Sequence, residues 1–135
     1  MNLTDQSKKF LSALHPKMRP RWAARYRDLL SRQGGRLVCL EWPSRDPREL
    51  GPGPAWALPP QVYLAHLSRP GRDVPTDENG AVDPAYVEGL LAQGQGEERG
   101  LVRLAHFKPR RTHPAGVDLH GEVRDWISVW KHADA

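Results

Sequence analysis

The stretch from Gly34 to Pro43, with the sequence GGRLVCLEWP, limits the possible folds of this chain more than any other. Its two glycines would end a preceding helix, the apolar run after them has no helical period, and Pro43 prevents the run from continuing. This pattern predicts a short strand buried on both faces, which is typical of parallel sheets. In open α/β sheets ligands bind beyond the carboxyl ends of the strands, so we expect chemistry near Glu41, Trp42 and the segment after them.

The composition restricts the class of protein. The chain has 135 residues, 39% of them hydrophobic, which is enough for one domain with a core. No apolar run is long enough to cross a bilayer, and residues 1–9 are too polar for a signal peptide, so we expect no membrane partner and a cytoplasmic location. The single Cys39 cannot form an internal disulfide, and its place in an apolar strand favours a packed thiol over a nucleophile.

The charge and the histidines exclude two further classes. Lysine and arginine outnumber the acidic residues by 20 to 16, but these basic residues are scattered and form no stripe with aromatic neighbours. We therefore expect no nucleic-acid partner. His106, His113 and His120 are seven residues apart, a spacing that matches no common set of metal ligands, so we expect no metal site.

Three segments have the apolar period of helices. The first runs from Met18 to Gly34 with Pro20 in its first turn, the second is Pro60 to Leu67, and the third begins at Asp83-Pro84 and ends before Gly94. The residues expected to face the core are Met18, Trp22, Tyr26, Leu29 and Leu30 in the first helix, Val62, Tyr63 and Leu67 in the second, and Tyr86, Val87, Leu90 and Leu91 in the third.

Two strands and a long loop complete the prediction. Leu101 to Phe107 and Asp125 to Trp130 have the pattern of strands, and because no helix separates them they are expected to pair antiparallel at the end of the sheet. Residues 43–61 are rich in proline and form a semi-rigid loop around Trp56, which favours a functional loop. The succession of helices and strands predicts an α/β fold.

Four segments carry a resemblance to a known family, and they cover nearly all of the chain in order. They are FLSALHPKMRPRWA from Phe10, GGRLVCLEWP from Gly34, GPAWAL from Gly53, and the run from Leu104 through Arg111-Thr112-His113 to Trp130. Together these segments resemble the thiol and thiopurine S-methyltransferase-like family, particularly its fungal thiol/halide methyltransferase branch. Members of that family are S-adenosylmethionine-dependent class I methyltransferases.

The resemblance implies that residues 10–135 are the C-terminal portion of a methyltransferase domain behind a non-matching leader at residues 1–9. Its sheet would be the C-terminal half of a Rossmann-like sheet, with the fifth strand at Arg36–Leu40 and a closing antiparallel hairpin. The family's Gly-rich cofactor loop lies in an upstream half that this sequence does not match, so we expect a truncated enzyme that binds S-adenosylmethionine weakly or not at all. A sheet cut beside the fifth strand would also self-associate through its exposed edge.

The resemblance and the strand ends together indicate a site. Phe10 and Leu11 match a segment that packs near the cofactor, although plain core residues would look the same. Trp42 and Trp56 would flank the mouth and bind a small thiol, halide or thiocyanate, or they simply cover the edge of the sheet. His113 could position or deprotonate a thiol, or be a solvated loop histidine.

Two alternatives stay open at the level of sequence. Glu41 could act as a general base, or it could hydrogen-bond the backbone amides of the following loop. The function predicted from the resemblance is methyl transfer from S-adenosylmethionine to a small thiol, halide or thiocyanate ion. The alternative is a non-catalytic remnant or interaction partner that keeps only the substrate-side half.

Overall fold

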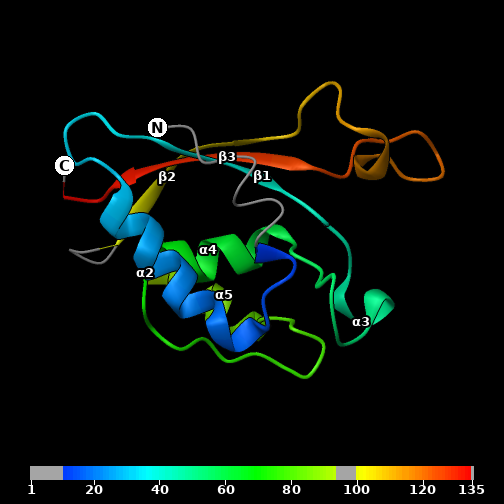
Figure 1. Ribbon diagram of the computed structural model, residues 1–135, viewed down its shortest axis with the longest axis horizontal. Coiled ribbons are helices and arrows are strands. Elements are labelled where there is room, and N and C mark those ends of the chain that lie inside the picture. The colour runs from blue at the N-terminus through cyan, green and yellow to red at the C-terminus, as the bar shows by residue number, and fades with distance from the viewer. Residues whose placement is uncertain (1–10, 94–99, 135) are drawn as a thin grey trace.

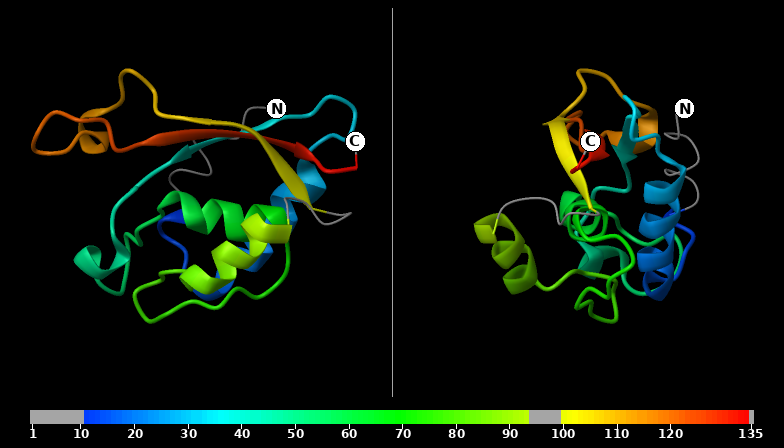
Figure 2. Two further views of the ribbon diagram at one scale, coloured as in Figure 1. Left: turned by 180° about the vertical axis from the view of Figure 1, so that it is seen from behind. Right: turned by 90° about the vertical axis from the view of Figure 1, so that its left-hand side faces the viewer.

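The computed structural model describes residues 11–93 and 100–134, which form a mixed α/β fold (Figure 1). The elements in chain order are η1 (Pro16–Met18), α2 (Arg19–Leu29), β1 (Leu37–Glu41), α3 (Pro47–Leu50), α4 (Pro60–Ser68), α5 (Pro84–Gln93), β2 (Leu101–Phe107), η2 (Pro114–Gly116) and β3 (Trp126–His132). The strands form one sheet in the order β1-β3-β2, and α2, α4 and α5 lie together against one side of it (Figures 1 and 2).

The direction of β1 differs from the sequence prediction. β1 pairs with β3, from Leu37 opposite Trp130 to Glu41 opposite Trp126, and the pairing is antiparallel. Within residues 11–93 and 100–134 the sheet contains no parallel pair of neighbours, so the prediction of a parallel sheet is wrong for this part of the chain. An apolar run predicts a buried strand, but it carries no information about the direction of the strand beside it.

The prediction that β1 is buried on both faces is also wrong. Leu37, Cys39 and Glu41 are buried, whereas Val38 and Leu40 between them are only half-buried. Successive side chains of a strand point to opposite faces of the sheet, and the helices cover only one of those faces (Figure 2). Cys39, which is fully buried, is the packed thiol that the sequence favoured.

The C-terminal hairpin confirms the predicted antiparallel pair. β2 and β3 pair antiparallel, with Phe107 opposite Ile127 and an irregularity between Arg103 and Ala105. β3 lies between β2 and β1, and because both neighbours run antiparallel to it, β1 and β2 run in the same direction. The connection from β1 to β2 carries α3, α4 and α5, so these two strands and their helices form a split β-α-β unit around β3.

The first predicted helix is shorter than its apolar pattern suggests. α2 ends at Leu29, five residues before Gly34, whose positive φ of 81° lies in the turn that leads to β1. Trp22, Tyr26 and Leu30 are buried as expected, but Met18 and Leu29 are 38% and 44% exposed. Met18 lies in η1, before α2 begins, and Leu29 is exposed at the last position of α2, whereas Arg19 and Leu30 beside them are buried.

The other two predicted helices are confirmed. α4 is buried along almost its whole length, including Val62, Tyr63 and Leu67, and it lies between α2 and α5 (Figure 2). α5 begins after Asp83, whose carboxylate caps the amide of Ala85 at 3.0 Å. Val87 and Leu90 of α5 are buried, but Leu91 is 60% exposed, so the buried face of this helix is narrower than predicted.

The core lies between the sheet and the helices. Trp130 of β3 is fully buried, and Trp22 of α2 packs edge-on against Tyr63 of α4 with 6.1 Å between the ring centroids. Among the described residues no helix has the length and apolar character needed to span a bilayer. The predicted leader, residues 1–9, lies outside the described residues, and self-association through a sheet edge stays a prediction.

Candidate functional site

Trp42 and His113, two of the residues singled out in the sequence, lie together. Trp42 follows β1 directly, and His113 comes from the long connection between β2 and β3. Their rings meet edge-on with centroids 5.6 Å apart, and Trp42 Nε1 donates to the carbonyl of Ala115 at 3.4 Å. His113 is not a solvated loop histidine, because its side chain is only 27% exposed.

Asp125 is the charged partner of His113, and the sequence analysis did not identify it. The Asp125 carboxylate is fully buried, and its Oδ2 accepts a hydrogen bond from Thr112 Oγ1. His113 Nε2 lies 2.9 Å from the same Oδ2, but in a direction that does not make a hydrogen bond. We call Trp42, Thr112, His113 and Asp125 the β-arm cluster. Trp42 follows the end of β1, Thr112 and His113 lie in the connection between β2 and β3, and Asp125 directly precedes β3.

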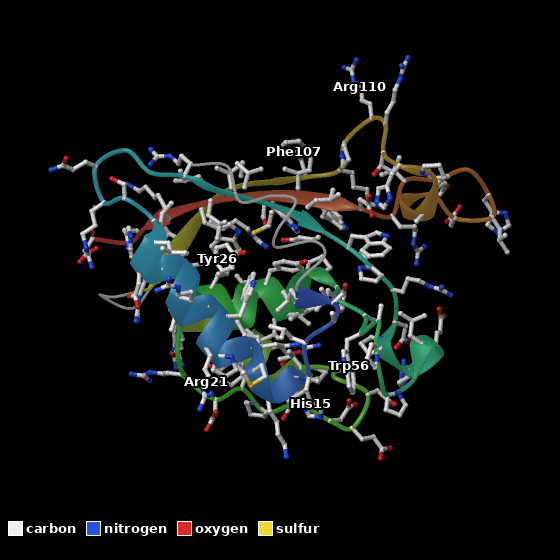
Figure 3. All side chains as sticks on the ribbon, in the orientation of Figure 1. His15, Arg21, Tyr26, Trp56, Phe107 and Arg110 are labelled. Atoms are coloured by element: carbon white, nitrogen blue, oxygen red, sulfur yellow. The ribbon has the colours of Figure 1, made fainter. Side chains whose placement is uncertain are left out.

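Trp56 lies in a different part of the molecule, beside the start of α2. Its ring packs edge-on against His15 at a centroid distance of 5.4 Å, as Figure 3 shows. Trp56 is 6% exposed and lines a cavity of about 550 Å³ that we call the Trp56 cavity. The residues that line it are His15, Pro16, Lys17, Pro20, Trp56, His66, Asp73, Val74, Thr76, Asp77 and Glu78. His113 and Trp42 are not among them, so the predicted site residues divide into two places.

A buried arginine lies against the wall of the Trp56 cavity. Arg19, at the start of α2, is fully buried, and its Nη1 donates a 2.8 Å hydrogen bond to the carbonyl of Gly80. A Cβ atom added to Gly80 would lie 3.0 Å from Arg19 Nη2, 3.1 Å from the Trp56 ring and 3.2 Å from Pro16. Because Trp56 and Pro16 line the cavity, the guanidinium lies next to its lining.

The charge of Arg19 is not balanced by a carboxylate. Arg19 Nε and Nη2 have no hydrogen-bond partner, and among the described residues no acidic side chain pairs with this guanidinium. Burial lowers the pKa of Arg19 from 12.5 to about 10, which still leaves the side chain charged at neutral pH. An uncompensated buried cation is costly, and it favours an anion nearby.

His66 adds a second unpartnered polar group to the same cavity. His66 lines the Trp56 cavity from α4, it is 2% exposed, and neither of its ring nitrogens has a hydrogen-bond partner. Burial, and secondarily the charge of Arg19, lower the pKa of His66 from 6.5 to about 3. The imidazole is therefore neutral at pH 7, with one N–H available to a ligand.

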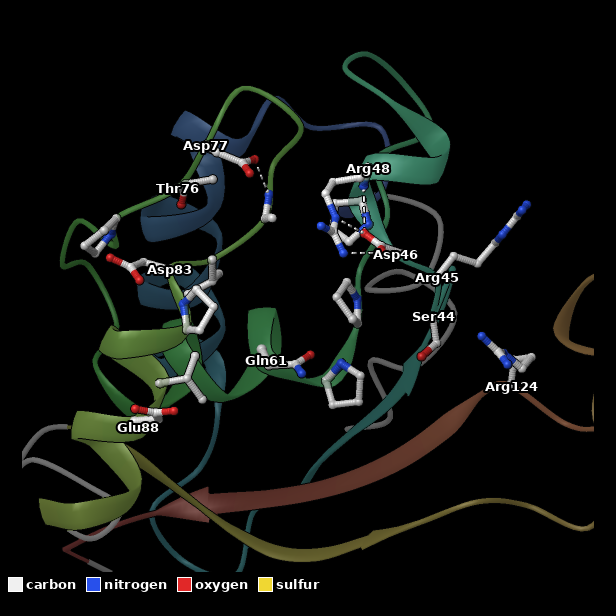
Figure 4. Close-up of a pocket in the computed structure, with 18 residues that line it drawn as sticks. Ser44, Arg45, Asp46, Arg48, Gln61, Thr76, Asp77, Asp83, Glu88 and Arg124 are labelled. Atoms are coloured by element: carbon white, nitrogen blue, oxygen red, sulfur yellow. Dashed lines mark hydrogen bonds and ion pairs between the residues drawn. The ribbon is translucent and has the colours of Figure 1, made fainter.

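Figure 4 shows a larger cleft, which shares Thr76 and Asp77 with the Trp56 cavity. It has a volume of about 1030 Å³ and lies where α3, α4 and α5 begin. Two of its acidic groups have structural partners: Asp46 caps α3 and pairs with Arg48 at 3.0 Å, and Asp83 caps α5. None of the buried unpartnered side-chain atoms of residues 11–93 and 100–134 lines this cleft, so the Trp56 cavity is the better candidate.

Glu41 and His106 form a buried pair that the sequence analysis did not predict. Glu41 Oε1 lies 2.9 Å from His106 Nε2, and Glu41 is fully buried. The other face of the His106 ring stacks on Trp126 at a centroid distance of 4.4 Å. Glu41 Oε1 is occupied by His106, whereas Glu41 Oε2 is buried without a hydrogen-bond partner among the described residues.

Weak or absent binding of S-adenosylmethionine stays a prediction. Of the two residues matched to the cofactor segment, Leu11 is fully buried in the core, and Phe10 lies outside the described residues. The glycines with positive φ lie in turns, and within residues 11–93 and 100–134 none stands between the end of a strand and the start of a helix in a Gly-rich loop.

Comparison with known proteins assigns no family: no family model matches the chain, and no curated protein matches it.

The residues that the sequence analysis missed did leave a signal. Arg19 stands three residues before Trp22 and seven before Tyr26, which puts it on the buried face of α2. His66 stands three residues after Tyr63, on the buried face of α4. Polar residues at core positions of an amphipathic helix are rare unless they have a partner. Nothing in the local sequence marks Asp125, which precedes a strand and is buried by a loop that folds back onto it.

Proposed function

We propose that this chain supplies the acceptor-binding part of an S-adenosylmethionine-dependent methyltransferase, and that the Trp56 cavity holds a small anionic acceptor such as a thiolate, halide or thiocyanate ion. One observation carries the proposal. Arg19 is a fully buried guanidinium whose single hydrogen bond among the described residues goes to a neutral carbonyl, and it lies against the wall of a cavity. An anion in that cavity would balance the charge of Arg19.

The chemistry of methyl transfer fits these surroundings. When a methyl group moves from a sulfonium to an anion, both charges disappear, so the reaction needs alignment and exclusion of water more than it needs a proton shuttle. In the Trp56 cavity, His66 would donate a hydrogen bond to the anion, the Trp56 ring would exclude water, and Arg19 would supply a positive field. These residues bind and orient the acceptor, and none of them has to move a proton when the acceptor is a halide.

The arrangement of the sheet also supports the proposal. The resemblance implies a fifth strand at Arg36–Leu40 and a closing hairpin, and the structure has β1 at Leu37–Glu41 beside the antiparallel pair of β2 and β3. Whether this sheet is the C-terminal half of a Rossmann-like sheet is part of the proposal. Binding of the methyl donor is not part of the proposal. We assign none of the described residues to S-adenosylmethionine, and we derive no reaction step that depends on its binding here.

The proposal is tested by the binding of thiocyanate, a probe with a fixed charge at any pH near neutrality. The chemical shifts of the Trp56 indole and the His66 ring would be followed by NMR as the salt is added, with gluconate used to keep the ionic strength constant because chloride is itself a halide. We expect saturable shifts for the wild type and an affinity at least about tenfold lower for Arg19→Met, because a charge-assisted contact contributes about 1.5–3 kcal/mol.

Arg21→Met is the matched control, because Arg21 lies two residues further along α2 and is exposed (Figure 3). It removes the same charge from the surface and should leave the thiocyanate affinity unchanged. Equal affinity for the wild type and Arg19→Met would contradict the proposal. If Arg19→Met and Arg21→Met lost the same thiocyanate affinity, the loss would come from the lower net charge of the protein. That result would also contradict the proposal.

A further inference from the structure

The Trp56 cavity has two ends of opposite charge. Its inner end has His66 and, behind the wall, the guanidinium of Arg19. Its outer end is formed by three carboxylates from one segment, Asp73, Asp77 and Glu78, which we call the acidic rim. The ammonium group of Lys17 also lines the cavity, but the carboxylates outnumber it. A ligand that spans the cavity therefore meets a positive field inside and a negative field at the mouth.

The acidic rim is available to a ligand. All three residues of the rim are exposed, and among the described residues neither Asp73 nor Glu78 is in an ion pair. Asp77 is partly occupied, since its Oδ1 accepts from the amides of Asn79 and Ala81 at 2.9 and 3.0 Å. These two bonds fix the turn that holds the rim in place, and both are accepted by Oδ1.

The acidic rim is not an isolated cluster, because a second observation points to a ligand in the same cavity. His66 is 2% exposed, and both of its ring nitrogens lack a partner although the ring lines the cavity. The Trp56 and His15 rings, which contact each other, also line this cavity. Aromatic faces attract cations, so they favour the same kind of group that the carboxylates of the rim attract.

We propose that the ligand of the Trp56 cavity is zwitterionic: a small molecule with an anionic group at one end and an ammonium group at the other. The anionic end would lie at His66 and Arg19, and the ammonium end would lie between Trp56 and the acidic rim. This inference rests on the proposed function, and it narrows the acceptor to a thiol or related nucleophile that also carries a cationic group. The cavity of about 550 Å³ suits a ligand of this size.

Two probes that differ in one group test the inference. Taurine has a sulfonate and an ammonium group, and isethionate has the same sulfonate with a hydroxyl in place of the ammonium. Both sulfonates are charged at pH 7 and neither probe reacts. Their affinities would be measured by NMR titration of the Trp56 and His66 signals. We expect the wild type to bind taurine about three- to tenfold more tightly than isethionate, because each partly exposed ion pair contributes about 0.2–1 kcal/mol.

Variants of the acidic rim make the test specific. In the double variant Asp73→Asn with Glu78→Gln, which keeps Asp77, the preference for taurine should fall to less than half of the wild-type value, while isethionate should bind as well as before or more tightly. Glu88→Gln with Asp28→Asn is the matched control, because these exposed carboxylates lie outside the cavity and their removal should keep the preference. Circular dichroism would check that each variant is folded.

The outcomes separate the inference from the function on which it rests. If both sulfonates bind equally to the wild type and lose affinity in Arg19→Met, the anion site stands and the zwitterion inference is wrong. If the rim variant keeps the full preference for taurine, the inference is also wrong, because another group must then bind the ammonium. If neither sulfonate nor thiocyanate binds, both the proposed function and the inference fail.

Discussion

Glu41 at the end of β1 and His106 in β2 join the two outer strands of the sheet across β3, with 2.9 Å between Oε1 and Nε2. Burial raises the pKa of Glu41, and hydrogen bonds from Ser128 and His106 oppose that rise. Ser128 also accepts a hydrogen bond from the indole of Trp130 at 2.8 Å, so the pair belongs to a buried polar chain on the core face of the sheet.

The raised pKa of Glu41 predicts how stability changes with pH. Between its unfolded pKa and its higher folded pKa, the folded protein binds more protons than the unfolded chain, so Glu41 costs stability as the pH rises. Glu41→Gln removes the ionisation and can still hydrogen-bond His106. We therefore expect the free energy of unfolding of the variant, relative to the wild type, to increase on going from pH 4 to pH 7.

Urea unfolding at the two pH values measures this difference. Glu88→Gln is the control, because Glu88 is exposed on α5 and the same substitution there should shift stability equally at both pH values. A difference for Glu41→Gln that does not change with pH would mean that the buried carboxyl is not destabilised by ionisation.

The lowered pKa of His66 predicts that stability falls as the pH falls, which is the opposite of the dependence expected from Glu41. Its pKa is about 3 in the folded protein and 6.5 in the unfolded chain, so between these values the unfolded chain binds one more proton and acid favours unfolding. This linkage should cost about 2 kcal/mol on going from pH 7 to pH 5. In His66→Phe this loss should disappear, whereas it should remain in His120→Phe, whose histidine is exposed. Equal acid sensitivity of wild type and His66→Phe, measured by denaturant unfolding, would contradict the burial of a neutral imidazole.

Gly116 controls the geometry of the β-arm cluster. A Cβ at this position would lie 2.6 Å from Asp125 Cγ and 2.7 Å from Thr112 Cγ2, closer than atoms can pack. Gly116→Ala should therefore destabilise the protein by about 1–3 kcal/mol and shift the NMR signals of His113. Gly89→Ala provides the contrast, since nothing lies within 4 Å of its added methyl group on α5, and it should stabilise by about 0.5–1 kcal/mol. If Gly116→Ala and Gly89→Ala unfolded at similar temperatures, the loop around Gly116 would accommodate the methyl group without loss of stability.

His113 tests whether the β-arm cluster takes part in thiol chemistry. His113 does not line the Trp56 cavity, so His113→Ala should leave thiocyanate binding unchanged. If a donor-binding part is fused upstream of Phe10, a His113 that acts as a base should matter for thiols by about 10²- to 10⁴-fold and be indifferent for iodide, which has no proton to lose. Equal loss for both acceptors would mean that the loop only shapes the site.

S-adenosylmethionine should bind this chain weakly or not at all. Leu11 is buried in the core, and the described residues have no Gly-rich loop between a strand and a helix. Calorimetric titration of S-adenosylmethionine into a sample that has been shown to bind thiocyanate should give no dissociation constant in the micromolar range. A micromolar value would place a donor site on this chain and extend the proposed function from acceptor binding to complete methyl transfer.

The sequence alone determined the local elements. The apolar run before Pro43 gave β1, the paired strand patterns gave β2 and β3, and Asp83-Pro84 gave the start of α5. These features could be predicted because a proline, a capping carboxylate or an apolar period acts on its own segment of chain. The burial of Cys39 followed from the same run.

The tertiary structure alone decided which elements meet. The antiparallel order β1-β3-β2, the separation of Trp56 from Trp42 and His113, and the burial of Arg19 all depend on the path of the chain between distant segments. Arg19 and Gly80 are 61 residues apart in the sequence, yet one hydrogen bond joins them at the Trp56 cavity. A local pattern can place an arginine on the buried face of a helix, but whether a carboxylate, a carbonyl or a ligand meets it there is set by packing across the whole fold.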